Sequence, residues 1–378
     1  MDDNSKNNPV PTLTELRGSI DSIDRQIHSL LNKRAICAQQ VADAKFIEFE
    51  AAKAAGENPQ EVLFYRPERE AQVLRKVMER NEGPLDSKVV AHIFREIMSA
   101  CLALEKPMQV AYLGPEGTFT QAAAVKHFGH GVIPQSQQTI ANVFAQVESG
   151  DCNYGVVPVE NSTEGMVTHT LDSFLNSSLK ICGEVELRIE LHLMAQDGVD
   201  IGNIKTIVAH QQALAQSRHW LDKHWPQVER IAVSSNGEGA RLAAQDPSIA
   251  AVAGTMAQEE YNLVNLSSSI EDYSNNTTRF LIIGRETVAD SGADKTSIAV
   301  TMRNKPGALF NILQPFQDAG VMLTRIDTRP SRTETWTYVF FIEFEGHIEE
   351  PKVKQVIEQI TAQSVMFKHF GSYPKAAL

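Results

Sequence analysis

The sequence has little cysteine and no long apolar run, and both absences limit what the chain can be. Its four cysteines are spread over 378 residues without a Cys-x-x-Cys pair, which argues against a disulfide framework or a zinc site and favours reduced thiols. No apolar stretch reaches the roughly 20 residues of a membrane-spanning helix, and the N-terminal segment is polar and acidic, unlike a secretion signal. We therefore expect a cytoplasmic protein.

Positive charge is also in deficit, because 35 lysines and arginines stand against 47 aspartates and glutamates, which gives a formal net charge of -12 at pH 7. A chain without a broad basic surface is a poor partner for nucleic acid or an anionic membrane, so any local cluster of arginines needs another explanation. The length of 378 residues exceeds one ordinary hydrophobic core. The sequence therefore predicts several domains.

The first hundred residues show only helical periodicity. Apolar side chains recur at three- and four-residue spacing from Leu13 to Leu30, which predicts an amphipathic helix that continues to about residue 50. At about 1.5 Å per residue this helix would be longer than a compact domain can cover, so it predicts a partner subunit. Two further helices are expected, one that begins at Pro67 and one that ends at Glu105.

The pattern changes after Lys106-Pro107 to short apolar strands that end in polar loops and are followed by helices. This alternation predicts one or two largely parallel sheets, whose ligands would bind beyond the carboxyl ends of the strands. The tail then follows the order strand, helix, strand, strand, helix, strand, which predicts a ferredoxin-like α+β domain. The expected domains are residues 1–106, 107–285 and 296–373, with a linker at 286–295.

Charged side chains interrupt the apolar faces of the predicted helices. Arg34 and Lys45 fall near the middle of the apolar stripe of the first helix, and Glu70 and Glu105 lie on the apolar faces of the other two. The long cationic side chains could lie along apolar surface and reach water at its edge. Otherwise such buried charges need either salt bridges or a bound anion.

These positions resemble the active site of the all-helical chorismate mutases, in which each protomer gives three helices to an intertwined dimer. The resemblance implies that Arg17 serves the other subunit's site, since it lies about 100° around the helix from Arg34. Rearranging chorismate needs a compact bound conformer and stabilisation of charge on the ether oxygen, to which Lys45 and a protonated Glu105 would contribute. The expected residues are Arg17, Arg34, Lys45, Arg66, Arg69, Glu70, Cys101 and Glu105. Arg66 and Cys101 replace an aspartate and a serine of many relatives, and Arg66 could simply be an exposed residue before a helix.

Four motifs in the middle of the chain together resemble prephenate dehydratase, a two-lobed fold similar to periplasmic solute-binding proteins. They are Gly114-Pro-Glu-Gly-Thr-Phe, Gly155-Val-Val-Pro-Val-Glu-Asn-Ser-Thr-Glu-Gly, His210 with Gln216, and Thr277-Thr278-Arg279-Phe280. The resemblance implies that Thr278 acts on the leaving hydroxyl of prephenate as a donor or proton relay, and that Arg279 clamps a carboxylate. The expected companions are Glu160, Asn161, Ser162 and Gln216. Helix capping is the alternative for Ser162, and a structural role is the alternative for His210.

The tail resembles an ACT domain, with Asn304-Lys-Pro-Gly-Ala-Leu-Phe at its first strand-to-helix turn and Thr324-Arg-Ile-Asp-Thr-Arg-Pro on its second strand. The resemblance implies that phenylalanine binds between two ACT domains and inhibits the dehydratase. Asp327 stands where phenylalanine-regulated relatives usually carry glutamate. The expected effector residues are Gly307, Ala308, Leu309, Asp327, Thr328, Arg329 and Pro330, although they could instead make only the turn and the dimer sheet.

The sequence thus predicts a multidomain bifunctional enzyme that acts on chorismate and prephenate, with phenylalanine as effector. We expect a homodimer or a tetramer, and neither a metal nor an organic cofactor. Two alternatives remain open: a dehydratase whose helical domain serves only dimerisation or regulation, and a non-catalytic amino-acid sensor.

Overall fold

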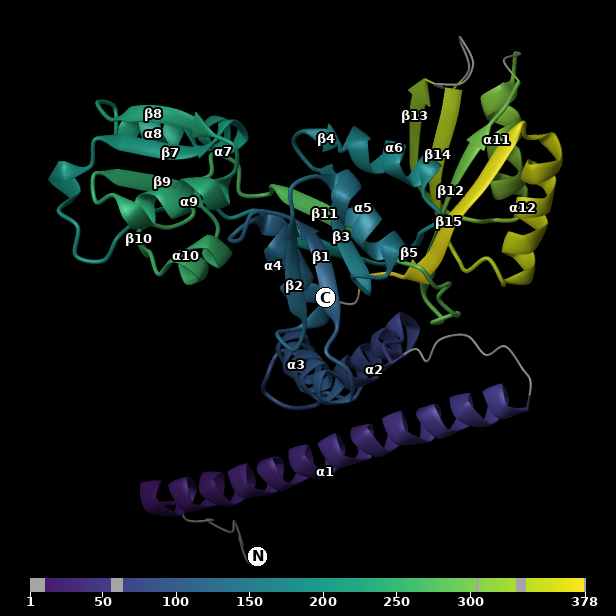
Figure 1. Cartoon of the computed structure of the whole chain (residues 1–378), viewed down its shortest axis with the longest axis horizontal. Coiled ribbons are helices and arrows are strands. Elements are labelled where there is room, and N and C mark those ends of the chain that lie inside the picture. Colours follow the sequence, from purple (N-terminus) through teal and green to yellow (C-terminus); the bar gives the residue numbers. More distant parts are fainter. Residues whose placement is uncertain (1–10, 56–63, 304–305, 331–337, 377–378) are drawn as a thin grey trace, which may run out of the picture. The chain divides into compact units, whose positions relative to one another are not determined.

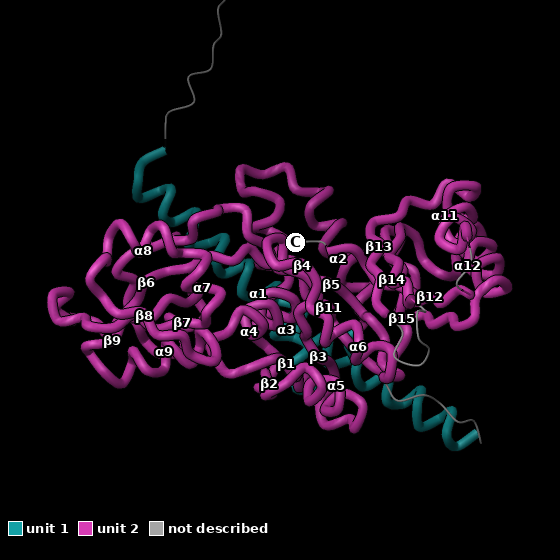
Figure 2. Tube along the Cα trace, turned by 90° about the horizontal axis from the view of Figure 1, so that it is seen from above, with its two compact units in different colours: residues 1–65, 97–107 teal, residues 66–96, 108–378 magenta. Residues whose placement is uncertain are grey.

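The chain divides into two compact units, which are described separately (Figure 2). The computed structural model describes residues 11–55, 64–303, 306–330 and 338–376. The polar N-terminal residues 1–10 and the first two residues of the predicted ACT turn, 304–305, lie outside these ranges. None of the described helices is both long enough and apolar enough to cross a membrane.

The three predicted helices are confirmed. Helix α1 (Leu13–Ala54) begins where the Thr12 side chain accepts a hydrogen bond from the Glu15 amide and the Glu15 carboxylate accepts one from the Thr12 amide. Its 42 residues include no buried side chain. The proline at the first position of α2 (Pro67–Glu79) is favourable there, and α3 (Ser87–Glu105) completes the helical segment.

The first α/β lobe contains a sheet with the strand order β2-β1-β3-β11-β5 and a short strand β4 beside β3. Strands β1, β2 and β3 are parallel, whereas β11 pairs antiparallel with β3 and β5. The bounds are β1 Gln109–Leu113, α4 Phe119–Phe128, β2 Ile133–Gln137, α5 Ile140–Ser149, β3 Tyr154–Asn161, β4 Gly165–Met166, α6 Thr168–Asn176, β5 Lys180–Arg188 and β11 Thr277–Gly284.

The second lobe has its own five-stranded sheet, in the order β10-β6-β9-β7-β8. Only β7, β8 and β9 are parallel to one another, so the prediction of largely parallel sheets is wrong for both lobes. In the first lobe the reason is that β11 follows the second lobe in sequence and returns between β3 and β5. The bounds are β6 His192–Ala195, β7 Thr206–His210, α7 Gln211–Gln216, α8 Arg218–His224, β8 Glu229–Val233, α9 Asn236–Gln245, β9 Ile249–Ala253, α10 Thr255–Tyr261 and β10 Val264–Ser267.

The tail has the predicted ferredoxin-like order, with an antiparallel sheet β13-β14-β12-β15. Helices α11 and α12 lie on one face of this sheet (Figure 1). The other face packs on the first lobe, where Phe341 and Phe370 share a core with Phe174 and Leu281. The bounds are β12 Asp294–Thr301, α11 Ala308–Asp318, β13 Leu323–Pro330, β14 Tyr338–Glu345, α12 Pro351–Gln363 and β15 Met366–Pro374.

The first lobe and the ACT sheet approach closely at one glycine. Gly371 of β15 has a φ of 155°, and a Cβ atom there would collide with the backbone of Ile181 on β5. A side chain at this position would push the two sheets apart. The contact therefore fixes the ACT sheet against the strand that neighbours β11.

Candidate active sites

A cavity of about 350 Å³ lies between the two α/β lobes. Its volume falls in the range of about 300 to 1,000 Å³ that is usual for small-molecule sites. The first lobe supplies residues from the ends of β1 and β3 and from the start of α4, and the second lobe supplies the starts of α7 and α9. The lining includes Leu113, Gly114, Thr118, Phe119, Thr120, Gln138, Asn161, Ile189, His210, Gln216, Ser235, Asn236, Asn276, Thr278 and Phe280.

Helix N-termini face this cavity from both lobes. Thr118 precedes α4, and its side chain donates to the Leu113 carbonyl, 3.1 Å away, instead of capping the helix. Ser235 caps α9 by accepting from the Glu238 amide at 3.0 Å. A Cβ atom on Gly237 would collide with the Glu116 carbonyl of the first lobe, so only glycine permits this close approach. The unpaired N–H groups of such helix starts favour a bound anion.

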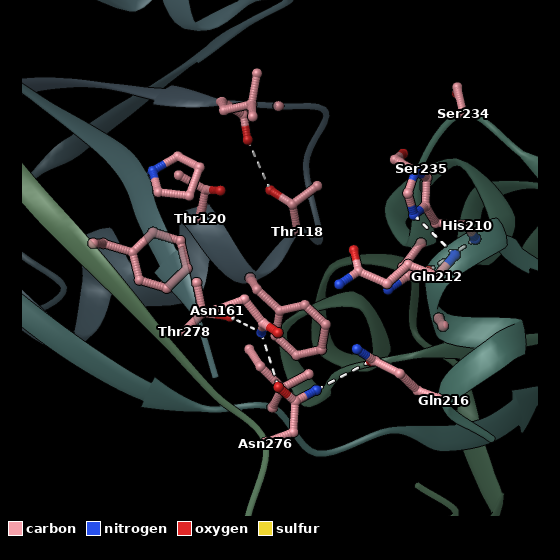
Figure 3. Close-up of a pocket in the computed structure, with 18 of the residues that line it drawn as sticks. Thr118, Thr120, Asn161, His210, Gln212, Gln216, Ser234, Ser235, Asn276 and Thr278 are labelled. Carbon is pink, nitrogen blue, oxygen red and sulfur yellow. Dashed lines mark hydrogen bonds between the residues drawn. The ribbon is translucent and has the colours of Figure 1, made fainter. Parts of the chain in front are cut away.

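Asn161 and Thr278 meet at the centre of the cavity wall (Figure 3). The Asn161 Nδ2 atom donates to Thr278 Oγ1 at 2.8 Å. The orientation of this amide is fixed because its Oδ1 atom accepts from the amide and hydroxyl of Thr163 and from the Glu164 amide. Since the Thr278 oxygen already accepts a hydrogen bond, its own proton is available to donate to a ligand.

Asn276 is a cavity residue that our reading of the sequence missed. It is 2% exposed, and its Oδ1 atom accepts from Asn161 while its Nδ2 atom donates to Gln216 at 3.1 Å. Gln216 in turn donates to Thr163 at 3.3 Å, so the chain of amides joins the second lobe to the first. The signal was present, because a residue two positions before Thr278 is expected on the same face of an extended chain.

Three of the predicted dehydratase residues do not line the cavity. Arg279 points to the opposite face of β11, where it bonds Glu343, and Glu160 bonds Arg325. Ser162 caps no helix, since its hydroxyl accepts from the Thr277 amide at 3.0 Å. Thus the lining contains no lysine or arginine among the described residues, and Arg279 is not positioned to clamp a ligand's carboxylate there.

His210 has a definite structural role at the cavity edge. It is the N-cap of α7, and its Nδ1 atom accepts from the Gln212 amide at 3.3 Å. In this bond the Nδ1 atom is the acceptor, so the ring itself caps the helix. The structural alternative for His210 therefore has direct support.

Arg34, Lys45 and Glu105 are all half-buried and lie close enough to interact electrostatically. Burial raises the pKa of the Glu105 carboxyl above its ordinary value, against the opposing attraction of Lys45 and Arg34. The Lys45 ammonium also lies 5.7 Å from the ring centroid of Phe64. The structure thus brings together two cations and an acid that keeps its proton more readily than an exposed glutamate.

The other predicted mutase residues are distributed over the two units. Glu70 is paired with Arg95 at 3.1 Å, so this inward-facing acid has a salt-bridge partner. Arg66 precedes α2 and bonds Glu68 at 2.6 Å, and its side chain is 57% exposed. This agrees with the alternative that Arg66 is simply an exposed residue before a helix. The remaining residues are exposed Arg17 on α1, exposed Arg69 on α2 and buried Cys101 on α3.

The predicted effector residues lie at the start of α11 and on β13. Gly307 has a φ of 81° as the N-cap of α11, which is the left-handed conformation that a tight turn into a helix needs. On β13, Arg325, Asp327 and Arg329 alternate with exposed residues and share one face. Asp327 pairs with Arg325, and Arg329 pairs with Asp172 of α6 at 3.2 Å. Leu309 and Thr328 are exposed.

Family models match the chain in three consecutive stretches. They describe chorismate mutase type II at residues 16–106, prephenate dehydratase at residues 110–288 and the ACT domain at residues 296–362. These three ranges fall in the order in which the sequence motifs occur.

Similar proteins include both full-length and shorter relatives. A bifunctional chorismate mutase/prephenate dehydratase of Pseudomonas aeruginosa is 56% identical over 366 residues, which cover 97% of this chain and 98% of that protein. A prephenate dehydratase of Mycolicibacterium vanbaalenii is 35% identical over 282 residues, 70% of this chain and 90% of that protein. The crystal structure of a prephenate dehydratase of Arthrobacter aurescens in complex with L-Phe superposes with a TM-score of 0.65 at 33% identity, and covers 71% of this chain and 90% of that one.

The chain combines a helical segment, a two-lobed α/β domain with a cavity between its lobes, and an ACT domain. Together these parts define a multidomain enzyme with a regulatory domain. The full-length similarity makes the assignment specific. The chain belongs to the family of bifunctional chorismate mutase/prephenate dehydratases.

Proposed function

We propose that the protein rearranges chorismate to prephenate in its helical part and converts prephenate to phenylpyruvate in the cavity between the lobes. Phenylalanine bound to the ACT domain inhibits the second reaction. The observation that carries this proposal is the Asn161–Thr278 hydrogen bond in the wall of the cavity between the lobes, in a chain that is 56% identical to a bifunctional enzyme over nearly its whole length.

Thr278 is the group that assists loss of the hydroxyl from prephenate. The Asn161 amide occupies one lone pair of the Thr278 oxygen, so the hydroxyl proton is directed to the leaving group. The same amide stabilises any negative charge that develops on Oγ1 as the proton moves. The apolar side chains of Phe119, Ile189 and Phe280 line the same cavity and keep a departing carboxylate poorly solvated, which favours its loss as carbon dioxide.

The retained carboxylate of prephenate is bound without a cationic side chain. The described lining residues include no lysine or arginine, and the starts of α4 and α9 offer backbone N–H groups instead. Gln216 of α7 and Asn276, which immediately precedes β11, add neutral donors. These neutral donors therefore take the carboxylate-binding role that the sequence predicted for Arg279.

The mutase site uses Arg34, Lys45 and Glu105 and is completed by a second subunit. Apolar residues along α1, such as Leu16, Ile20 and Ile27, are exposed in the single chain and need a partner surface. A second copy of this helix would cover them and would bring its exposed Arg17 to the site. The resulting dimer gives the two carboxylates of chorismate their arginine contacts.

The pH dependence of the mutase reports the protonation of Glu105. Only a protonated Glu105 donates to the ether oxygen, and burial raises its pKa, so activity is highest below the raised pKa and falls as pH increases through it. We expect Glu105→Gln to flatten this profile, because an amide donates at every pH. Initial rates of chorismate consumption from pH 5 to 9 measure it, with the dehydratase profile of the same variant as control. Identical mutase profiles for the two proteins would remove Glu105 from the mechanism.

Phenylalanine should inhibit the dehydratase and protect the ACT domain. We expect a coupling of about 1 to 3 kcal/mol between phenylalanine and the dehydratase ligand, which corresponds to a change in affinity of roughly 5- to 150-fold. Dehydratase rates with increasing phenylalanine, together with hydrogen exchange of α11 and β13, measure the effect. Unchanged rates and unchanged exchange at saturating phenylalanine would exclude regulation by this amino acid.

The direct test of the proposed function is to supply chorismate to the purified protein and follow prephenate and phenylpyruvate separately. We expect prephenate to form first and phenylpyruvate to follow without any added enzyme. Conversion of added prephenate with no consumption of chorismate would support the alternative in which the helical domain serves only dimerisation. Consumption of neither compound would support the non-catalytic sensor.

A further inference from the structure

Strand β11 carries a cavity residue on one face and a charged residue on the other. Thr278 and Phe280 line the cavity, and the Arg279 side chain between them points to the ACT sheet. Its guanidinium donates two parallel hydrogen bonds to Glu343 of β14, at 2.7 and 2.8 Å, and one to Glu184 of β5 at 3.1 Å. An ion pair of the ACT domain is therefore one residue away from Thr278.

Strand β3 repeats this arrangement in register with β11. Asn161 is the pairing partner of Thr278, and Glu160 is the partner of Arg279. Asn161 faces the cavity, whereas Glu160 bonds Arg325 of the ACT strand β13. Both members of the Asn161–Thr278 hydrogen bond thus have a neighbour in sequence that is paired to the ACT domain.

Burial makes these ion pairs difficult to break without moving the strands. Arg279, Glu184 and Glu343 are only 8%, 4% and 8% exposed, and Glu184 also bonds Lys295 of β12 at 2.7 Å. Burial alone would lower the pKa of Arg279, but the adjacent carboxylates of Glu343 and Glu184 raise it overall, so the guanidinium stays charged. A buried charge that loses its partner is strongly destabilising, so a displacement of β14 must be followed by β11.

The network is not fully satisfied, which leaves room for a second arrangement. Among the described residues, two buried side-chain nitrogens lack a hydrogen-bond partner, and they are the Nε atoms of Arg279 and Arg329. Each arginine side chain forms an ion pair between the first lobe and the ACT domain. The Glu160 carboxylate lies 3.7 Å from the Nε atom of Arg279 and is bonded to Arg325 instead. A small shift would transfer Glu160 from Arg325 to Arg279.

We propose that Arg279, Glu343, Glu160 and Arg325 are positioning residues that couple an amino acid bound at Asp327 to the Asn161–Thr278 pair. This inference rests on the proposed function, because Asp327 belongs to the proposed phenylalanine site. Asp327 is paired with Arg325, and the ammonium group of an amino acid competes with Arg325 for that carboxylate. Displaced Arg325 releases Glu160 to Arg279, and β3 moves against β11. The 2.8 Å bond that prepares Thr278 for proton donation is then lost.

The test compares Glu343→Gln with Glu345→Gln in the full chain. Glu345 lies two residues along the same strand and pairs with Lys375 rather than with the first lobe, so its substitution controls for loss of a carboxylate on β14. The dissociation constant of L-phenylalanine is measured by calorimetry with and without saturating phenylpyruvate, and dehydratase inhibition is measured in parallel. Circular dichroism and thermal unfolding of each variant report that the chain is folded.

In the unsubstituted protein and in Glu345→Gln, phenylpyruvate should weaken phenylalanine binding by a factor of roughly 5 to 150. In Glu343→Gln, this factor should fall below about threefold and inhibition should be largely lost, while phenylalanine still binds in the absence of phenylpyruvate. Undiminished coupling in Glu343→Gln would overturn the inference. If that variant does not fold, Glu160→Gln interrupts the second ion pair at a half-exposed side chain, and the same readout decides. An unsubstituted protein that lacks dehydratase activity or phenylalanine binding would instead refute the proposed function.

Discussion

Thr278→Val is expected to lower the dehydratase kcat by about 10²- to 10⁴-fold, the contribution that a positioned proton donor usually makes. Valine keeps the shape of threonine but has no hydroxyl, so it cannot donate to the leaving group. The substitution also leaves the Asn161 Nδ2 atom with only Asn276 as a partner. Phenylpyruvate formation from saturating prephenate measures the loss.

Thr277→Val is the matched control for this substitution. Thr277 is the adjacent residue of β11, and it is not among the residues that line the cavity. Its variant should keep the dehydratase rate within about twofold, since the Thr277 side chain is only partly buried and lies outside the cavity lining. A Thr278→Val enzyme as fast as this control would show that the hydroxyl is not the donor.

Arg34→Met should lower the mutase kcat/KM by about 10²- to 10³-fold, a cost typical of removing one electrostatic contact to a transition state. Methionine keeps an apolar side chain of intermediate length, so the packing of the α1 side chains changes little while the guanidinium is lost. The dehydratase reaction of the same chain should continue, because the cavity lies in the other compact unit. Chorismate consumption and prephenate conversion are measured on one preparation.

The neighbouring Lys33 provides the control for charge. Lys33 is exposed on α1, whereas Arg34 is half-buried and contributes to the electrostatic environment of Glu105. Lys33→Met should therefore leave the mutase almost unchanged. Equal mutase rates for Arg34→Met and the unsubstituted protein would show that Arg34 is not part of the mutase site.

Local patterns in the sequence predicted many, though not all, of the elements of the fold. Three-four spacing located α1, and the order of strands and helices in the tail predicted the ferredoxin-like ACT domain. The pairing of β11 with β3 and β5 was not predictable in this way. A strand's direction depends on where the chain returns from the second lobe, and that is a property of the tertiary fold.

The candidate sites show the same division. Thr278, Asn161 and Gln216 were predicted and lie together, whereas Arg279 and Glu160 belong to the opposite face of the same two strands. Strand alternation requires neighbours to face opposite sides, but only the tertiary structure shows that the ACT domain occupies the second side. Likewise, the spacing of apolar residues predicted an apolar stripe along α1, and this stripe is uncovered in the single chain. The surface that we propose to cover it belongs to another copy of the chain.

The most direct test of two separate sites in one chain is to measure both reactions on the unsubstituted protein, Arg34→Met and Thr278→Val. We predict that the unsubstituted protein consumes chorismate and prephenate, that Arg34→Met loses only the first reaction, and that Thr278→Val loses only the second. Loss of both reactions from either single substitution, or retention of both in each variant, would contradict the assignment.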